Sequence, residues 1–157
     1  MTLLDWIKET TKERGTAVVE MALVLPILIA LAFGIGDFGV AMNRKNDATH
    51  MANLGARLAA VNANPGAASS QTLQDYVLAQ GDTASLRDSS KTQVCITFPD
   101  GTGAVGHPVE VDVKTSYQWL PYFVKQGYTT KSLVGKAVMR LEQTPTNFSP
   151  SNNSVSC

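Results

Sequence analysis

The chain has 157 residues, with thirteen basic and thirteen acidic side chains. This balance gives no electrostatic reason to expect nucleic acid or a strongly charged substrate as a partner. The length is enough for one membrane helix and one small domain of roughly 90 residues.

The first fifteen residues form a polar segment of mixed charge that ends in Arg14-Gly15. Leu3, Leu4 and Ile7 fall at helical spacing, so a short amphipathic turn fits the pattern. The composition nevertheless favours a solvated leader over residues 1–15.

Residues 16–42 form an apolar run whose only ionisable residues are Glu20 and Asp37. At 1.5 Å per residue these carboxylates lie about 25 Å apart along a helix, close to the roughly 30 Å of a bilayer's hydrocarbon core. The run therefore predicts one transmembrane helix with a carboxylate at each rim. Pro26 removes one backbone hydrogen bond from this helix and should bend it.

Small residues recur at four-residue spacing inside the apolar run, in the pairs Ala30/Gly34 and Ala32/Gly36. Such spacing lets a second helix approach closely in lipid. Because Gly and Ala are common in any membrane helix, the spacing fits ordinary composition equally well. The candidate helix-packing residues are Ala30, Gly34 and Gly36.

Residues 43–66 are predicted to extend the same helix as an amphipathic segment. Met51, Leu54, Leu58 and Val61 recur at helical spacing and would form one apolar stripe. Asn64-Pro65-Gly66 should end the helix. Arg57 lies off the stripe and is expected to be solvated.

Residues 67–157 are predicted to form an exported α+β domain. A short helix capped by Ser70 ends at Gly81, and three apolar/polar alternations predict strands over 92–98, 108–120 and 132–142. A one-sided sheet needs an apolar cover, and the stripe on the helix is the available one. We therefore expect a small antiparallel sheet on the outer half of the long helix, with 143–157 as a flexible tail.

The two cysteines, Cys95 and Cys157, are most simply a disulfide in an exported domain and free thiols in the cytosol. Cys95 should point away from the apolar face of its strand and pin the tail across the sheet. Closing a loop of about sixty residues would stabilise the fold by roughly 4 kcal/mol.

The sequence contains no recognisable catalytic set. His50 and His107 stand alone, with no metal-ligand spacing to the cysteines. The glycines of the apolar run lie mid-helix and form no phosphate loop. We therefore expect neither an enzyme nor a metal or other cofactor.

The junction at Arg14-Gly15, followed by Thr16-Ala17-Val18-Val19-Glu20 and a long apolar helix, resembles a type IV prepilin processing site. The continuation is similar to one subfamily, the TadE-like minor pilins of the tight-adherence (Flp) pilus system. The segments that carry this likeness are Ala22-Leu23-Val24-Leu25-Pro26, residues 33–39, Gly55-Ala56-Arg57 and the closing strand 137–142.

The resemblance implies cleavage between Gly15 and Thr16 by a prepilin peptidase, a pilin-like fold, and a role for Glu20 in subunit assembly. It also implies partners: other minor pilins, the major pilin, the inner-membrane assembly platform and membrane lipid. The chain would cross the bacterial inner membrane once, with its C-terminal domain on the periplasmic or extracellular side. Basic residues flank the apolar run on both sides, so charge alone does not fix this orientation.

Two alternatives stay open at the level of sequence. Ala30-Leu31-Ala32 is a small-x-small site after an apolar run, as ordinary signal peptidase requires, and cleavage there would release a secreted domain starting at Phe33. An uncleaved single-span anchor would instead begin at Met1 and display its domain to a partner other than a pilus.

Overall fold

The computed structural model describes residues 3–119 and 130–150 of the chain. A long helix, α1 (Leu3–Ala60), is followed by a 3₁₀ helix η1 (Ala67–Ser69), by α2 (Leu73–Ala79) and by strands β1 (Thr92–Thr97), β2 (Pro108–Gln118) and β3 (Thr130–Arg140). The predicted α+β class, a long N-terminal helix with a small antiparallel sheet, is confirmed. The chain divides into two compact units, one up to Gly39 and one from Val40 onward.

The first unit is the N-terminal part of α1. Its backbone is helical from Leu3, and the prediction of a leader over residues 1–15 stays a prediction. Pro26 lies inside the helix, where its missing N–H leaves the carbonyl of Ala22 without the usual i→i−4 hydrogen bond.

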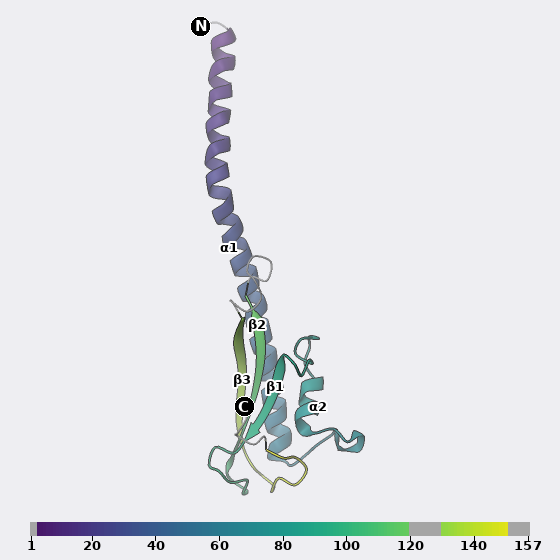
Figure 1. Ribbon diagram of the computed structural model, residues 1–157. Helices are drawn as coiled ribbons and strands as arrows, with labels where there is room; N and C mark the ends of the chain where they lie inside the picture. Colours follow the sequence, from purple (N-terminus) through teal and green to yellow (C-terminus); the bar gives the residue numbers. More distant parts are fainter. Residues whose placement is uncertain (1–2, 120–129, 151–157) are drawn as a thin grey trace. The chain divides into compact units, whose positions relative to one another are not determined.

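The second unit contains a three-stranded sheet in the order β1-β2-β3, with both pairs antiparallel (Figure 1). Val94 lies opposite Val113, and Val111 lies opposite Ala137. Because the side-chain period of a strand is two, this register places Val94, Ile96, Val109, Val111, Val113 and Ala137 on one face, whereas Val134 and Val138 of β3 lie on the other.

The apolar face of the sheet is the one that alternation predicted. Val109, Val111 and Val113 of β2 are fully buried, and Ile96 of β1 is buried beside them. The strand bounds differ from the prediction by only one or two residues at most ends. The prediction for the inner face of the sheet is thus confirmed.

The predicted stripe on the second half of α1 is confirmed in part. Met51 is fully buried, and Leu58 is half-buried and packs against the core. Leu54 is half-buried, and Val61 is 42% exposed and lies beyond the helix. The face that meets the sheet consists instead mainly of alanines: Ala48, Ala52, Ala56 and Ala59, with Met51 among them.

The reason is the short distance between α1 and the sheet. A Cβ on Gly135 of β3 would lie 2.2 Å from the carbonyl carbon of Ala48 and 2.3 Å from the backbone nitrogen of Thr49. Gly55 of α1 is also close to its neighbours but less crowded, since its Cβ would lie 3.1 Å from Val111 Cγ1, which is a side-chain atom. Backbones this close leave no room for leucine between them, so small side chains face the sheet and the larger ones lie at its margins.

The end of α1 lies earlier than Asn64-Pro65-Gly66, the predicted stop. The helix ends at Ala60, and Asn62 adopts a left-handed backbone conformation with φ of 53°. Asparagine tolerates this conformation better than most residues because its short side chain bonds locally to backbone groups.

Asn62 also anchors the segment that follows the sheet. Its side-chain oxygen accepts hydrogen bonds of 2.9 Å from the backbone N–H groups of Thr146 and Asn147, and its carbonyl accepts one of 2.8 Å from the Asn147 side chain. Phe148 then enters the core, where it is 8% exposed. The prediction of a flexible tail is therefore wrong for residues 143–150, which lack helix and strand but are held in place. Residues 151–157 lie outside the described part of the chain.

The short helix α2 begins later than predicted, because its cap is Thr72 and not Ser70. The Thr72 hydroxyl accepts from the Asp75 N–H at 3.1 Å, and the Asp75 carboxylate accepts from the Thr72 N–H at 3.4 Å. This reciprocal pair is a capping box. Leu73 and Val77 of α2 are fully buried in the core.

Replacing Gly135 with alanine should test the close contact between β3 and α1. The added Cβ would overlap backbone atoms of Ala48 and Thr49, so we expect a loss of about 1–3 kcal/mol in the free energy of unfolding. Denaturant titration of the purified chain measures this loss. Gly34→Ala is the matched control, because a Cβ there meets nothing within 4 Å. Equal stability of the two variants would contradict the proposed reason for the alanine face.

Candidate membrane and assembly site

The N-terminal unit presents an apolar surface on every side of its helix. Along residues 18–42, large apolar side chains in all directions are 42–73% exposed, among them Val18, Leu23 and Ile35. The most apolar window has a mean hydropathy of 2.5, and none of it is buried. By length and composition this helix could cross a membrane.

The two carboxylates of the apolar run differ in their surroundings. Glu20 is exposed, whereas Asp37 is half-buried. Gly15 and Thr16 both lie inside α1, so the peptide bond that joins them is part of a helix. A peptidase that cuts an extended chain would first have to unwind this turn.

The candidate helix-packing residues lie on an accessible surface. Ala30, Gly34 and Gly36 are all exposed, and no described atom outside the helix lies within 4 Å of a Cβ built on either glycine. The surface has room for a second helix, and the packing itself stays a prediction.

Cys95 lies between Val94 and Ile96, whose side chains are in the core. Alternation along β1 therefore places its side chain on the outer face of the sheet, yet it is only 2% exposed. Cys157 lies outside the described residues, so the disulfide between Cys95 and Cys157 stays a prediction.

A charged row crosses the outer face of the sheet. Lys136 Nζ lies 2.7 Å from Glu110 Oε1, and this hydrogen bond raises the pKa of Lys136, with the charge of Asp112 contributing less. The Asp112 Oδ1 atom is buried and has no hydrogen-bond partner among the described residues. These groups form a polar surface on the sheet and no catalytic set.

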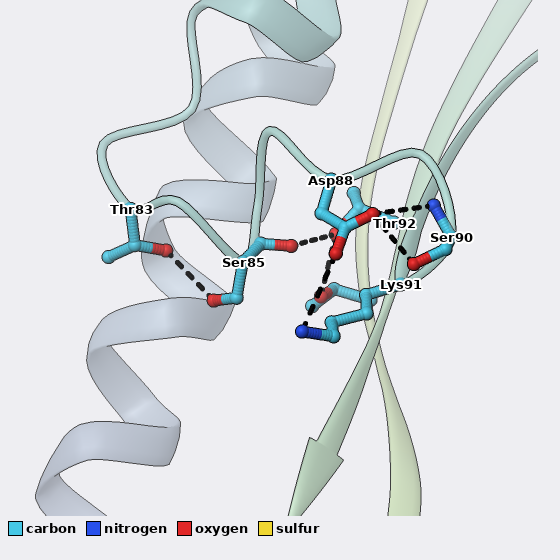
Figure 2. Close-up of polar contacts among 7 residues, drawn as sticks. Thr83, Ser85, Asp88, Ser90, Lys91 and Thr92 are labelled. Carbon is cyan, nitrogen blue, oxygen red and sulfur yellow. Dashed lines mark hydrogen bonds and ion pairs between the residues drawn. The ribbon is translucent and has the colours of Figure 1, made fainter.

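A compact polar turn leads from α2 into β1 (Figure 2). Asp88 Oδ1 accepts hydrogen bonds from the Ser90 hydroxyl at 2.6 Å and the Ser90 N–H at 2.9 Å, while Asp88 Oδ2 lies 3.4 Å from Lys91 Nζ. Both hydrogen bonds from Ser90 lower the pKa of Asp88, and the bond from the hydroxyl contributes more than the bond from the N–H. The turn thereby fixes the backbone that carries Lys91.

The same turn is joined to the sheet through a buried pair of hydroxyls. Thr92 Oγ1 donates to the Ser85 carbonyl at 3.1 Å and lies 2.9 Å from Thr115 Oγ1 on β2. Leu86, the one large apolar residue among the mostly polar residues 82–91, is fully buried in the core. A single leucine without periodic neighbours gave no signal in the sequence.

An aromatic and cationic cluster lies where β2 ends. The Arg44 guanidinium of α1 lies 5.0 Å from the centre of the Tyr117 ring, and Tyr117 meets Trp119 edge-to-face at 5.3 Å. A cation over an aromatic face is attracted by the ring quadrupole. Alternation predicted that Tyr117 and Trp119 share a face, but it gave no indication of the contact with Arg44.

In the part of the chain that the structure describes, no three His, Cys, Asp or Glu side chains gather in a way that could hold a metal ion. His107 Nδ1 lies 3.3 Å from Asp100 Oδ2 in an exposed loop, as a solitary pair.

The fold defines the class of the protein as α+β, with one long N-terminal helix that could span a membrane and one small three-stranded antiparallel sheet. Residues 15–57 match the family model described as TadE-like protein. The match supports a likeness of this part of the chain to the TadE-like proteins of the tight-adherence (Flp) pilus system. It includes Gly15, Glu20 and the Gly55-Ala56-Arg57 segment, in which Gly55 is one of the close contacts with the sheet.

No curated protein and no solved structure matches the chain.

The turn around Asp88 gives a test in solution. A carboxyl group whose pKa is lowered in the folded state contributes stability above its ordinary pKa, and this contribution is lost as the pH falls through the lowered value. Ser90→Ala removes the hydroxyl bond, so the pKa of Asp88 should rise toward its ordinary value in an NMR titration. Ser89→Ala, at the adjacent exposed position, is the control and should leave that pKa unchanged. An unchanged pKa in Ser90→Ala would show that the hydroxyl bond is not the cause.

Proposed function

We propose that this chain is a minor pilin that a prepilin peptidase cleaves after Gly15 and that then supports assembly of a tight-adherence pilus. The observation that carries the proposal is an apolar, exposed helix with one carboxylate, Glu20, placed five residues after the processing junction. The mature chain would act either within the fibre or in priming its assembly.

The exposed apolar surface of the helix supports a place in lipid or among other apolar helices. A helix that packs on the surface of a soluble domain hides one apolar stripe and exposes polar residues elsewhere. Here the apolar side chains point in all directions and none of the most apolar window is buried. Lipid in the precursor, and neighbouring pilin helices after assembly, would provide the missing cover.

Cleavage after Gly15 would create a new helix N-terminus at Thr16. Glu20 would then lie just over one turn into the helix, near the positive end of the helix dipole. A charged carboxylate costs on the order of 2.5 kcal/mol or more at the bilayer centre and less near the rim. The α-amino group of Thr16 on a neighbouring subunit would neutralise Glu20 and offset that cost.

The glycine at the junction also suits the cleavage step. The Gly15–Thr16 bond lies in a helix, and glycine weakens a helix interior by about 1 kcal/mol relative to alanine. Gly15 therefore makes local unwinding easier and presents no side chain to the peptidase.

The proposed partners follow from the family. They are the prepilin peptidase, the other minor pilins, the major pilin and the assembly platform of the bacterial inner membrane. The domain from Val40 onward would lie on the periplasmic or extracellular side, where a disulfide between Cys95 and Cys157 is stable.

N-terminal sequencing of the mature protein tests the cleavage site. Cleavage by a prepilin peptidase gives Thr16 as the first residue, cleavage by signal peptidase gives Phe33, and an uncleaved anchor gives Met1. In Gly15→Val the β-branched side chain should block cleavage and leave the full-length precursor in the membrane. A mature mass unchanged by Gly15→Val would contradict the assignment.

Substitution of Glu20 tests the assembly role. Glu20→Gln keeps the size of the side chain and removes its charge, so the chain should still be inserted and still be cut after Gly15. Without the ion pair we expect surface pili to be lost, as counted by electron microscopy, and copurification of other pilins to fall.

Glu9→Gln is the control, because it removes a carboxylate from the segment that processing discards. Normal pili in the Glu20→Gln strain would refute the ion pair and leave Glu20 as an interfacial carboxylate that reaches the headgroups. Accumulation of uncut Glu20→Gln precursor would assign the residue to processing and not to assembly.

A further inference from the structure

One end of the exported domain gathers cationic and hydroxyl side chains. A hollow of about 310 Å³ lies there, and its lining includes Lys91, Lys114 and Lys131 together with Ser90, Ser116 and Ser132. None of the described residues that line it is acidic. The lysines come from three places far apart in the chain: the turn before β1, the middle of β2 and the start of β3.

The positions of these groups are fixed by the sheet. The Ser116 N–H donates to the Lys91 carbonyl at 2.9 Å, and Ser116 lies opposite Ser132 in the register of β2 and β3. The turn in Figure 2 holds Lys91 through Asp88. Since Asp88 already pairs with Lys91, Lys114 and Lys131 are the main sources of uncompensated charge.

The hollow lies at the end of the sheet that is near Arg44, where the part of α1 belonging to this domain begins. Tyr117 pairs with Lys131 across the sheet, and the Tyr117 ring lies under Arg44 of α1. At the other end of the sheet, Ala60 accepts a hydrogen bond from the Glu142 N–H. Arg44 and Ala60 of α1 thus lie near opposite ends of the sheet. The lysines lie at the same end of the sheet as Arg44.

Arg44 follows the apolar run, which ends at Met42, by two positions. In a chain that spans a bilayer, residues directly after the span lie in the headgroup layer, where tyrosine and tryptophan are also enriched. Clusters of lysine and arginine at this level are attracted by anionic lipid. Ammonium groups together with serine hydroxyls supply the donors that a phosphate group requires.

From this placement we infer that the end of the exported domain formed by Arg44, Lys114, Trp119 and Lys131 is a docking surface for the anionic phospholipid headgroups of the membrane that its helix spans. The lysines bind the phosphate groups, and Trp119 lies at the level of the headgroups. Tyr117 is buried and supports this surface from beneath through its contacts with Arg44 and Trp119. Docking would hold the domain against the bilayer before assembly, and entry into a fibre would require its release.

The inference rests on the membrane insertion in the proposed function, so the experiment measures the two separately. The full chain with Trp6→Phe, which leaves Trp119 as the sole tryptophan, is reconstituted into phosphatidylcholine vesicles with or without phosphatidylglycerol. Flotation with pure phosphatidylcholine reports insertion of the helix. Quenching of Trp119 by a lipid with a nitroxide on its headgroup reports docking.

We expect stronger quenching of Trp119 when phosphatidylglycerol is present, and loss of the difference at high salt. Lys114→Gln with Lys131→Gln should lower the ratio of docked to undocked chains about tenfold or more, given the free energy gained per lysine near an anionic surface. Arg57→Gln with Arg140→Gln is the matched control: it removes the same charge from exposed positions away from the hollow and should leave the quenching unchanged.

Equal quenching in the two kinds of vesicle, or an equal effect of the two double variants, would overturn the docking surface while leaving the proposed function intact. A chain that fails to float with phosphatidylcholine would overturn both. Far-UV circular dichroism of the double variants serves as the check on their fold, so that a loss of quenching with an unchanged spectrum reports lost docking and not unfolding.

Discussion

The close contact of α1 with β3 is the constraint on which the domain from Val40 onward depends. Gly135 lies so near Ala48 that a single added carbon would overlap the helix backbone. This distance dictates small residues along the facing side of α1, where alanines alternate with the single large residue Met51. The bulk of the core must then come from the sheet and from α2, through residues such as Val111 and Leu73.

The two parts of α1 carry different side chains, which suit different surroundings. Before Val40 the helix carries large apolar residues on every side, which suits lipid or other apolar helices. After Val40 it carries polar residues on the outside and alanines toward the sheet. The helical backbone, whose hydrogen bonds are internal, serves in both settings without change.

Much of the fold could be predicted from local patterns, because alternation in β2 and β3 reflects burial of one face directly. The alanine face of α1 could not, since alanine carries little hydrophobic signal and the leucines nearby fit the same helical spacing. Leu86 and Phe148 escaped prediction for a related reason: each is one apolar residue in a polar stretch, with no period to reveal it. A junction at Gly15 could be proposed from the sequence because its signal lies in consecutive residues. The cluster around Tyr117 could not be predicted, because it joins residues more than seventy positions apart.

Asn62 shows how a polar residue completes a domain with so small an apolar core. Its left-handed conformation turns the chain away from α1, and its side chain then holds the backbone at Thr146 and Asn147. This hold brings Phe148 into contact with Phe98 at 6.4 Å between ring centres, which covers the end of the sheet opposite Arg44. The chain after β3 is thereby anchored through buried contacts at a point close to the end of α1. A disulfide at Cys95 would add a second, covalent anchor to a segment that hydrogen bonds and one aromatic side chain already hold.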